Sequence, residues 1–87
     1  MIRKQLTIQL SEGLEARPIA LLVQEVSQYA SSIYIELKGK QINAKSIMGM
    51  MSLRLAPGDA ITIVTNGADE EVAVQGIERF LSSVKNR

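Results

Sequence analysis

Hydrophobic and polar positions change their period several times along this 87-residue chain. Residues 2–10 alternate, with Leu6, Ile8 and Leu10 on one face, which predicts a half-buried strand. From about residue 16 to residue 28 the apolar positions recur at helical spacing, which predicts a helix. Alternation returns at 33–37, and the tight connection Lys38-Gly39 followed by a strand of about 41–44 indicates a hairpin.

The second half of the chain repeats this change of period. Residues 46–53 predict a short helix rich in methionine, which ends before Pro57. Residues 60–65 predict a strand with Ile61 and Ile63 on one face and Val64 partly covered on the other. A last helix follows Asp69, because acidic residues favour a first helical turn. Its predicted buried stripe consists of Val72, Ala73, Gly76, Ile77, Phe80, Leu81 and Val84.

The order of these elements predicts one α+β domain over residues 1–87. Strand, helix, strand, strand, helix, strand, helix gives a single sheet with the helices on one face, an open-faced sandwich. The other face carries polar residues, among them Thr7, Tyr34, Glu36 and Thr62, and faces water.

The composition of the chain argues against several functional classes of protein. Ten basic and nine acidic residues leave a net charge of +1, which supplies no field for nucleic acid or an anionic membrane. Without histidine or cysteine there is no zinc-finger site, histidine base or cysteine nucleophile, and no glycine loop of the phosphate-binding kind is present. We therefore expect neither an enzyme nor a cofactor or metal. Residues 1–5 lack the apolar run of a signal peptide, so a cytoplasmic location is expected.

Ser46 precedes the methionine-rich helix, and its position allows two interpretations. As an N-cap, its hydroxyl accepts a backbone N–H bond worth about 1 kcal/mol. As a phosphorylation site, it would carry about −1.5 to −2 charges where the helix dipole favours an anion. The methionines also allow two interpretations: either they all fill the core, or Ile47, Met48 and Met51 form an exposed apolar docking patch.

Glu15 precedes Ala16-Arg17-Pro18 at the predicted start of the first helix. Pro18 fits the first helical turn, where its missing N–H has no partner in any case. A carboxylate here is typical of a helix start, since the dipole favours it by about 0.3–1 kcal/mol. A functional role for Glu15 is the alternative.

Three segments together resemble the HPr phosphocarrier family of the bacterial sugar phosphotransferase system. They are residues 13–18, residues 43–53 and residues 67–70, in the family's order and spacing. The resemblance implies a four-stranded antiparallel sheet with three helices on one side, in agreement with the order derived above.

The chain departs from this family at one position. In phosphocarriers the residue before Ala-Arg-Pro is a histidine that passes a phosphoryl group from enzyme I to sugar transporters. Here that residue is Glu15, and the chain contains no histidine. We therefore expect no histidine phosphorelay. Beside the helix start and Arg17, the carboxylate could imitate part of the charge of a phosphohistidine.

The chain is most similar to the catabolite repression branch of the family, HPr-like proteins that keep the serine and lack the histidine. The resemblance implies that an HPr kinase/phosphorylase modifies Ser46, with Arg17 and Lys45 near the phosphate. The phosphorylated form would serve as corepressor for a LacI-type repressor, catabolite control protein A. The partner-binding residues implied are Ile47, Met48, Met51, Ala16 and Ala20.

Two other functions remain open at the level of sequence. One is a phosphoryl carrier that uses a different acceptor. The other is a constitutive binding domain for a metabolic enzyme or transporter, which acts through Ile47, Met48 and Met51 without phosphorylation. The exposed edges of a small open sheet also allow a weak homodimer in place of a monomer.

Overall fold

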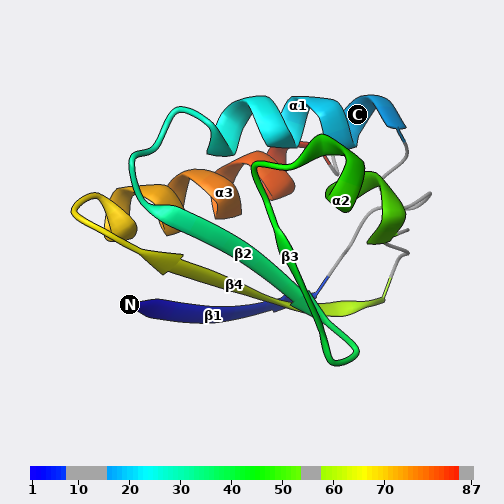
Figure 1. Cartoon of the computed structure of the whole chain (residues 1–87), viewed down its shortest axis with the longest axis horizontal. Coiled ribbons are helices and arrows are strands. Elements are labelled where there is room, and N and C mark those ends of the chain that lie inside the picture. The colour runs from blue at the N-terminus through cyan, green and yellow to red at the C-terminus, as the bar shows by residue number, and fades with distance from the viewer. Residues whose placement is uncertain (8–15, 54–57, 85–87) are drawn as a thin grey trace.

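The computed structural model describes residues 1–7, 16–53 and 58–84, with the backbone alone at residues 16–18, 53 and 82–84. The predicted order of strands and helices is confirmed (Figure 1). The elements are β1 (Ile2–Thr7), α1 (Ala16–Val26), β2 (Ser32–Leu37), β3 (Lys40–Asn43), α2 (Ile47–Leu53), β4 (Ala60–Asn66) and α3 (Glu70–Val84).

The four strands form one antiparallel sheet in the order β1-β4-β2-β3, and all three helices lie over the same face of it (Figure 1). Between β2 and β3, Lys38 and Gly39 have φ angles of 51° and 82°. Two consecutive positive φ values are typical of the type I′ turn that joins the strands of a tight hairpin. The predicted open-faced sandwich and its hairpin are therefore confirmed.

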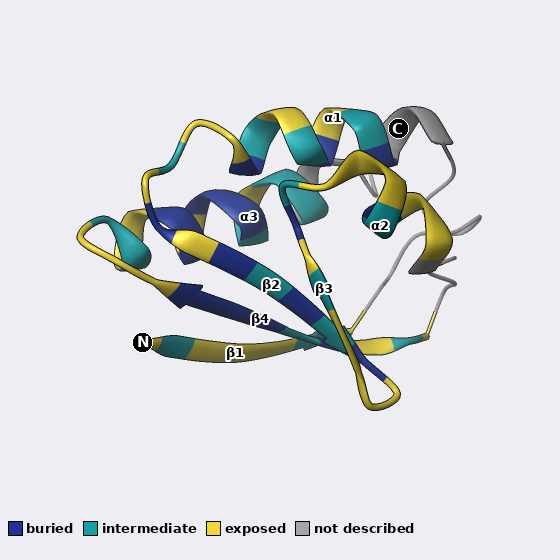
Figure 2. Ribbon diagram, viewed as in Figure 1, coloured by how far each residue is buried: buried dark blue, intermediate teal, exposed yellow. Residues whose placement is uncertain are grey.

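The core lies between the sheet and the helices (Figure 2). The strands contribute alternate apolar residues from β2 and β4, as the period-2 pattern predicts. The helices contribute the residues of their apolar stripes, and Met50 from α2 is fully buried. The largest core side chains are Leu22, Val26, Ile33, Ile35, Met50, Ile61, Ile63 and Ile77.

The predicted stripe of α3 was wrong at one position and incomplete at another. Val72 is 59% exposed, whereas Val74 is buried. Each residue turns an α-helix by about 100°, so Val72 lies about 140° around the axis from the buried Ile77, and Val74 only about 60° away. Phe80 and Leu81 are partly buried against the core, as predicted.

Val64, predicted to be partly covered, is buried although it faces away from the helices. It pairs with Tyr34 of β2 on one side and with Arg3 of β1 on the other, and neighbours of that size cover a β-branched side chain. Glu36 and Thr62 on this face are half-buried and Thr7 is exposed. The polar outer face is confirmed, with an apolar residue covered within it.

The end of helix α1 differs slightly from the prediction. Helix α1 ends at Val26 and not at Gln28, because Gln28 and Tyr29 donate to carbonyls three residues back, those of Glu25 and Val26. Such bonds tighten the last turn of a helix. The predicted continuation of the first strand, residues 8–10, and the predicted stripe residue Val84 lie outside the part for which side chains are described.

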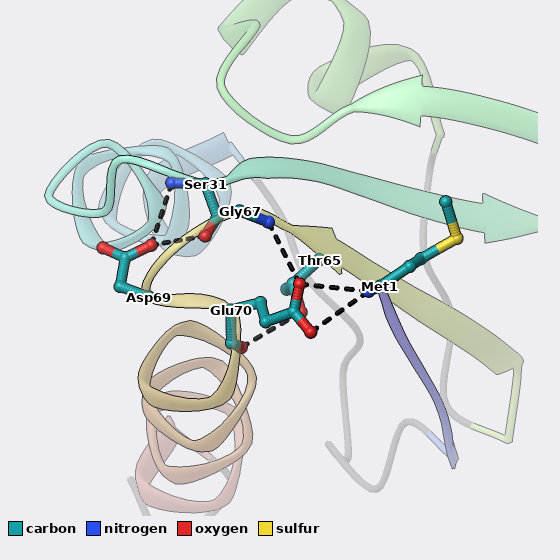
Figure 3. A network of polar contacts seen from close by, with 6 residues as sticks. All are labelled: Met1, Ser31, Thr65, Gly67, Asp69 and Glu70. Carbon is teal, nitrogen blue, oxygen red and sulfur yellow. Dashed lines mark hydrogen bonds and ion pairs between the residues drawn. The ribbon is translucent and has the colours of Figure 1, made fainter.

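Asp69 joins the start of α3 to the turn before β2 (Figure 3). Its carboxylate accepts the backbone N–H groups of Ala30 and Ser31, each at 2.9 Å, and the Ser31 hydroxyl. The hydroxyl bond, followed by the N–H bonds, lowers the pKa of Asp69 below its ordinary value. Ser31 is buried, so this carboxylate satisfies polar groups that water does not reach.

Glu70 fastens the N-terminus of the chain to the same corner (Figure 3). Its carboxylate accepts the Gly67 N–H at 3.1 Å and pairs with the Met1 ammonium at 3.1 Å. The Gly67 bond and then the ammonium lower the pKa of Glu70. Its backbone carbonyl accepts the hydroxyl of the buried Thr65 at 3.0 Å. These bonds hold the N-terminus at the start of α3, at the opposite end of the sheet from α2 (Figure 1).

Candidate functional site

Ser46 is the N-cap of α2. Its hydroxyl oxygen accepts the N–H of Gly49 at 3.2 Å, and its carbonyl accepts the N–H of Met50 at 2.9 Å. Both bonds are those of an N-cap residue. The capping interpretation is therefore confirmed, and the side chain is nevertheless exposed. An exposed hydroxyl remains accessible to a modifying enzyme, so the cap does not exclude the second interpretation.

The turn before the helix fixes the direction in which Ser46 enters it. The side-chain oxygen of Asn43 accepts the Lys45 N–H at 2.9 Å, and the Asn43 carbonyl accepts the Ser46 N–H at 3.0 Å. An asparagine that bonds the backbone two residues on is typical of such a turn. The hairpin strand β3 therefore delivers the serine directly to the start of α2.

Gly49 allows α2 to lie close to β3. A Cβ at this position would lie 2.9 Å from the Ile42 methyl Cγ2 and 3.3 Å from the Ser46 hydroxyl oxygen. Both distances are shorter than ordinary van der Waals contact, so a larger residue would push the helix away from the strand or disturb the cap. The glycine thus serves packing and capping together.

The methionines of α2 divide between core and surface. Met50 is 0% exposed, whereas Met48 is 82%, Met51 is 47% and Ile47 is 44% exposed. A helix of seven residues presents only one face to a sheet, so the remaining apolar side chains point to water. We call Ile47, Met48 and Met51 the α2 patch. The prediction of an exposed patch is confirmed, and the alternative that all the methionines fill the core is wrong.

An open groove of about 480 Å³ adjoins the α2 patch between α1 and α2. Ile47 belongs both to the groove and to the patch, and Ala20, a predicted docking residue, lines the groove on the α1 side. Leu21 also lines it and is exposed, a residue that the sequence analysis missed. Leu21 could have been identified from the sequence, because it is an apolar residue outside the buried stripe of α1. The full lining is Ala20, Leu21, Val23, Gln24, Ser27, Lys45 and Ile47.

Lys45, predicted to lie near a phosphate on Ser46, lines this groove as well. Its ammonium donates to the Tyr29 carbonyl at 2.7 Å, just beyond the C-terminal end of α1. A cation is favourable there because the helix dipole is negative at that end. The ammonium therefore has a partner before any phosphate is added.

Three other predicted residues are not placed in the same detail. Glu15 lies outside the described residues, and Ala16 and Arg17 are described only as the first two residues of α1. Their roles stay predictions from the sequence. Within the described part of the chain, histidine, cysteine, aspartate and glutamate form no group of three that could hold a metal ion. None of the helices described there is long and apolar enough to cross a membrane.

The fold and the site define a small open-faced sandwich with a capped, exposed serine beside an apolar surface. A family model described as "PTS HPr component phosphorylation site" matches residues 2–83. The chain is 48% identical over 81 residues to the HPr-like protein Crh of Halalkalibacterium halodurans, covering 93% of this chain and 96% of the relative. It is 40% identical over 81 residues to Crh of Bacillus subtilis, covering 93% and 95%.

Solved structures agree with this similarity. HPr-C-His from Thermoanaerobacter tengcongensis superposes with a TM-score of 0.93 at 38% identity, covering 100% of this chain and 98% of the other. Crh of Bacillus subtilis, described as an intertwined dimer with a swapped domain, gives 0.75 at 38% identity, covering 95% of each chain.

The chain belongs to the HPr family. Its relatives at 40–48% identity include HPr-like Crh proteins, and these relatives are carriers and regulators, not enzymes.

Proposed function

We propose that this protein is a regulatory HPr-like protein switched by phosphorylation of Ser46. A serine kinase/phosphorylase adds and removes the phosphate, and the phosphorylated form acts as corepressor for a LacI-type catabolite control protein. The observation that carries the proposal is the exposed Ser46 hydroxyl at the N-cap of α2, adjacent in the chain to the α2 patch.

Phosphorylation at an N-cap changes the surface and leaves the helix in place. The phosphate oxygens can accept the Gly49 N–H that now bonds the Ser46 hydroxyl at 3.2 Å, and the helix dipole favours the added charge. The net charge of the chain falls from +1 to roughly −0.5 to −1. We expect the fold to survive because Met50 of α2 is buried in the core, whereas Ser46 and its phosphate are exposed to water.

The partner that fits this surface presents arginine next to an apolar groove. The α2 patch supplies apolar area, and a phosphoserine supplies oxygens for one to three charge-assisted hydrogen bonds. Ala20 and Leu21 extend the contact surface along α1. In a complex with the unphosphorylated protein, the arginine of the partner would be desolvated without forming these bonds. The affinity therefore depends on the phosphate.

With Glu15 in place of the histidine, we expect the chain not to transfer phosphoryl groups as phosphocarriers do. A carboxylate repels an incoming phosphoryl donor, and the chain offers no histidine in its place. We expect Glu15 to act at most as a fixed negative charge near Arg17. A kinase and a repressor as partners imply a cytoplasmic protein. We expect it to be a monomer or a weak homodimer.

Intact-mass analysis tests the modification. The protein is incubated with ATP and an HPr kinase/phosphorylase, and separately with phosphoenolpyruvate and enzyme I. We expect one phosphate from ATP and none from phosphoenolpyruvate. Ser46→Ala should abolish labelling. Ser52→Ala is the matched control, because Ser52 is an exposed serine of the same helix whose hydroxyl donates to the Gly49 carbonyl at 2.7 Å. Labelling by neither donor, or labelling that survives Ser46→Ala, would overturn the proposal.

Binding of the phosphorylated protein to a purified catabolite control protein tests the docking surface. Met51→Asp should abolish binding, since it places a charge in the α2 patch. Val72→Asp is the control, because Val72 is an exposed apolar residue of α3 outside the patch. Equal loss with both variants would refute a role for the patch.

One alternative function has an observation in its favour. The α2 patch is exposed in the unmodified protein, so a metabolic enzyme or transporter could dock without phosphorylation. Binding that is unchanged by Ser46→Ala and abolished by Met51→Asp would favour this constitutive binding domain over the switch.

A further inference from the structure

The side chains that oxidants attack most readily are restricted in this protein to methionine. The chain contains four methionines and no cysteine, histidine or tryptophan. Two of the four, Met48 and Met51, belong to the α2 patch. A mild oxidant therefore finds its preferred targets concentrated on the surface that we propose for docking.

Exposure separates the methionines sharply within one short helix. Met48 is 82% exposed and Met51 is about half exposed, whereas Met50 between them is buried in the core. Susceptibility of methionine to oxidation follows exposure. Met1 is also exposed, but it is held at Glu70 at the opposite end of the molecule (Figure 1).

We infer that Met48 and Met51 form a reversible methionine oxidation site, at which a peroxide-class oxidant makes the α2 patch polar while the fold is retained. In this step the thioether sulfur attacks one peroxide oxygen, an S–O bond forms and the O–O bond breaks. The sulfur loses two electrons and becomes the sulfoxide. The leaving oxygen takes the proton of the transferred oxygen and departs as water from hydrogen peroxide, or as an alcohol from an organic peroxide. Methionine sulfoxide reductases reverse the step at the expense of thiols.

The fold is retained because oxidation affects neither the cap nor the core. The Ser46 hydroxyl accepts the backbone N–H of Gly49, and Met50 is the one buried residue among residues 47–52 of α2, for which side chains are described. A sulfoxide converts a flexible apolar side chain into a polar one, and such a change disrupts methionine-rich interfaces. The consequence for partner binding rests on the proposed function. Oxidation would then oppose docking even when Ser46 carries its phosphate.

Peptide mapping after timed exposure of the folded protein to hydrogen peroxide tests the site itself. We expect Met48 and Met51 to oxidise at least about tenfold faster than Met50, in the order of their exposure. In denaturant the three rates should become equal. Circular dichroism should be unchanged after oxidation of the first two. Equal rates in the folded protein, or unfolding as Met48 and Met51 react, would overturn the inference.

Two binding measurements test the change in surface character. Retention on a hydrophobic interaction column needs no partner and should fall on oxidation. Binding of the Ser46-phosphorylated protein to a catabolite control protein should weaken by at least about fivefold and recover after treatment with reductase. A Met48→Leu/Met51→Leu variant keeps the volume and the apolar surface. It should bind normally and resist peroxide in both measurements.

The outcomes separate this inference from the proposed function. If the unoxidised phosphoprotein fails to bind the repressor, the proposed function fails, while selective oxidation and reduced column retention still support the oxidation site. If the repressor binds the reduced and oxidised proteins equally, the effect on docking is refuted and the proposed function stands. Unchanged column retention after complete oxidation of Met48 and Met51 would refute the change in surface character.

Discussion

Gly76 lies in the middle of α3, where helix propensity and packing favour opposite residues. Alanine in a helix interior is more stable than glycine by about 0.5–1 kcal/mol. However, a Cβ on Gly76 would lie 1.9 Å from the Tyr29 hydroxyl oxygen and 2.9 Å from its ring carbon Cζ. That hydroxyl donates to the Glu25 carboxylate at 2.7 Å, a bond that raises the pKa of Tyr29. The tyrosine would have to move.

The magnitude of Gly76→Ala follows from these opposing terms. Overpacking at a contact of this kind costs typically about 1–3 kcal/mol. Displacing the ring also breaks the partly exposed hydrogen bond to Glu25, worth about 1 kcal/mol. Subtracting the gain in helix propensity leaves a net loss of about 1–3.5 kcal/mol in the free energy of unfolding. For a domain of this size each 1 kcal/mol lowers Tm by about 4–8 °C.

A double-mutant cycle makes the prediction sharp. In a Tyr29→Ala background the obstructing ring is gone, so Gly76→Ala should stabilise the protein by about 0.5–1 kcal/mol. The sign of the effect therefore reverses between the two backgrounds. Urea unfolding followed by circular dichroism measures both, with the m-value as a check that compactness is unchanged. A stabilising Gly76→Ala in the presence of Tyr29 would refute the reasoning.

Acid unfolding, helix capping and phosphoryl transfer provide three further predictions. The pKa of Asp69 is lower in the folded state than in the unfolded state, so its carboxylate stabilises the fold above about pH 4 and this contribution is lost as the pH falls through the lowered value. Asp69→Asn should therefore flatten the pH dependence of urea unfolding below about pH 5, and an unchanged profile would contradict the role of its bonds to Ser31. Ser46→Ala should lower the free energy of unfolding by about 1 kcal/mol through loss of the cap, measured as a fall in Tm, whereas Ser46→Asp, which can still cap, should lose less. Glu15→His should allow labelling by phosphoenolpyruvate and enzyme I. If Glu15→His is not labelled, the missing histidine is not what prevents the transfer; labelling of the unsubstituted protein would contradict the expected loss of phosphorelay.

The pattern of apolar residues determined the order and type of every described element, because periods of 2 and 3.6 distinguish strands from helices over such lengths. It also predicted the hairpin and the cap, both of which depend on neighbours in the chain. It misassigned Val72 and omitted Val74, although an advance of about 100° per residue already places Val74 nearer than Val72 to Ile77 around the helix axis. Val64 likewise became buried through its neighbours Tyr34 and Arg3 on adjacent strands.

The sequence by itself determined the chemistry of the candidate site: a serine at a helix start, the absence of histidine, and an excess of apolar residues around Ser46. Only the tertiary structure decided which of those residues face water. A helix of seven residues can bury one face, and the close contact of Gly49 with Ile42 fixes which face that is. Met50 is thereby turned into the core and Met48 and Met51 outward. Local periodicity cannot make this choice, because it depends on how α2 packs against β3 and against α1, and those packing contacts form only in the folded chain.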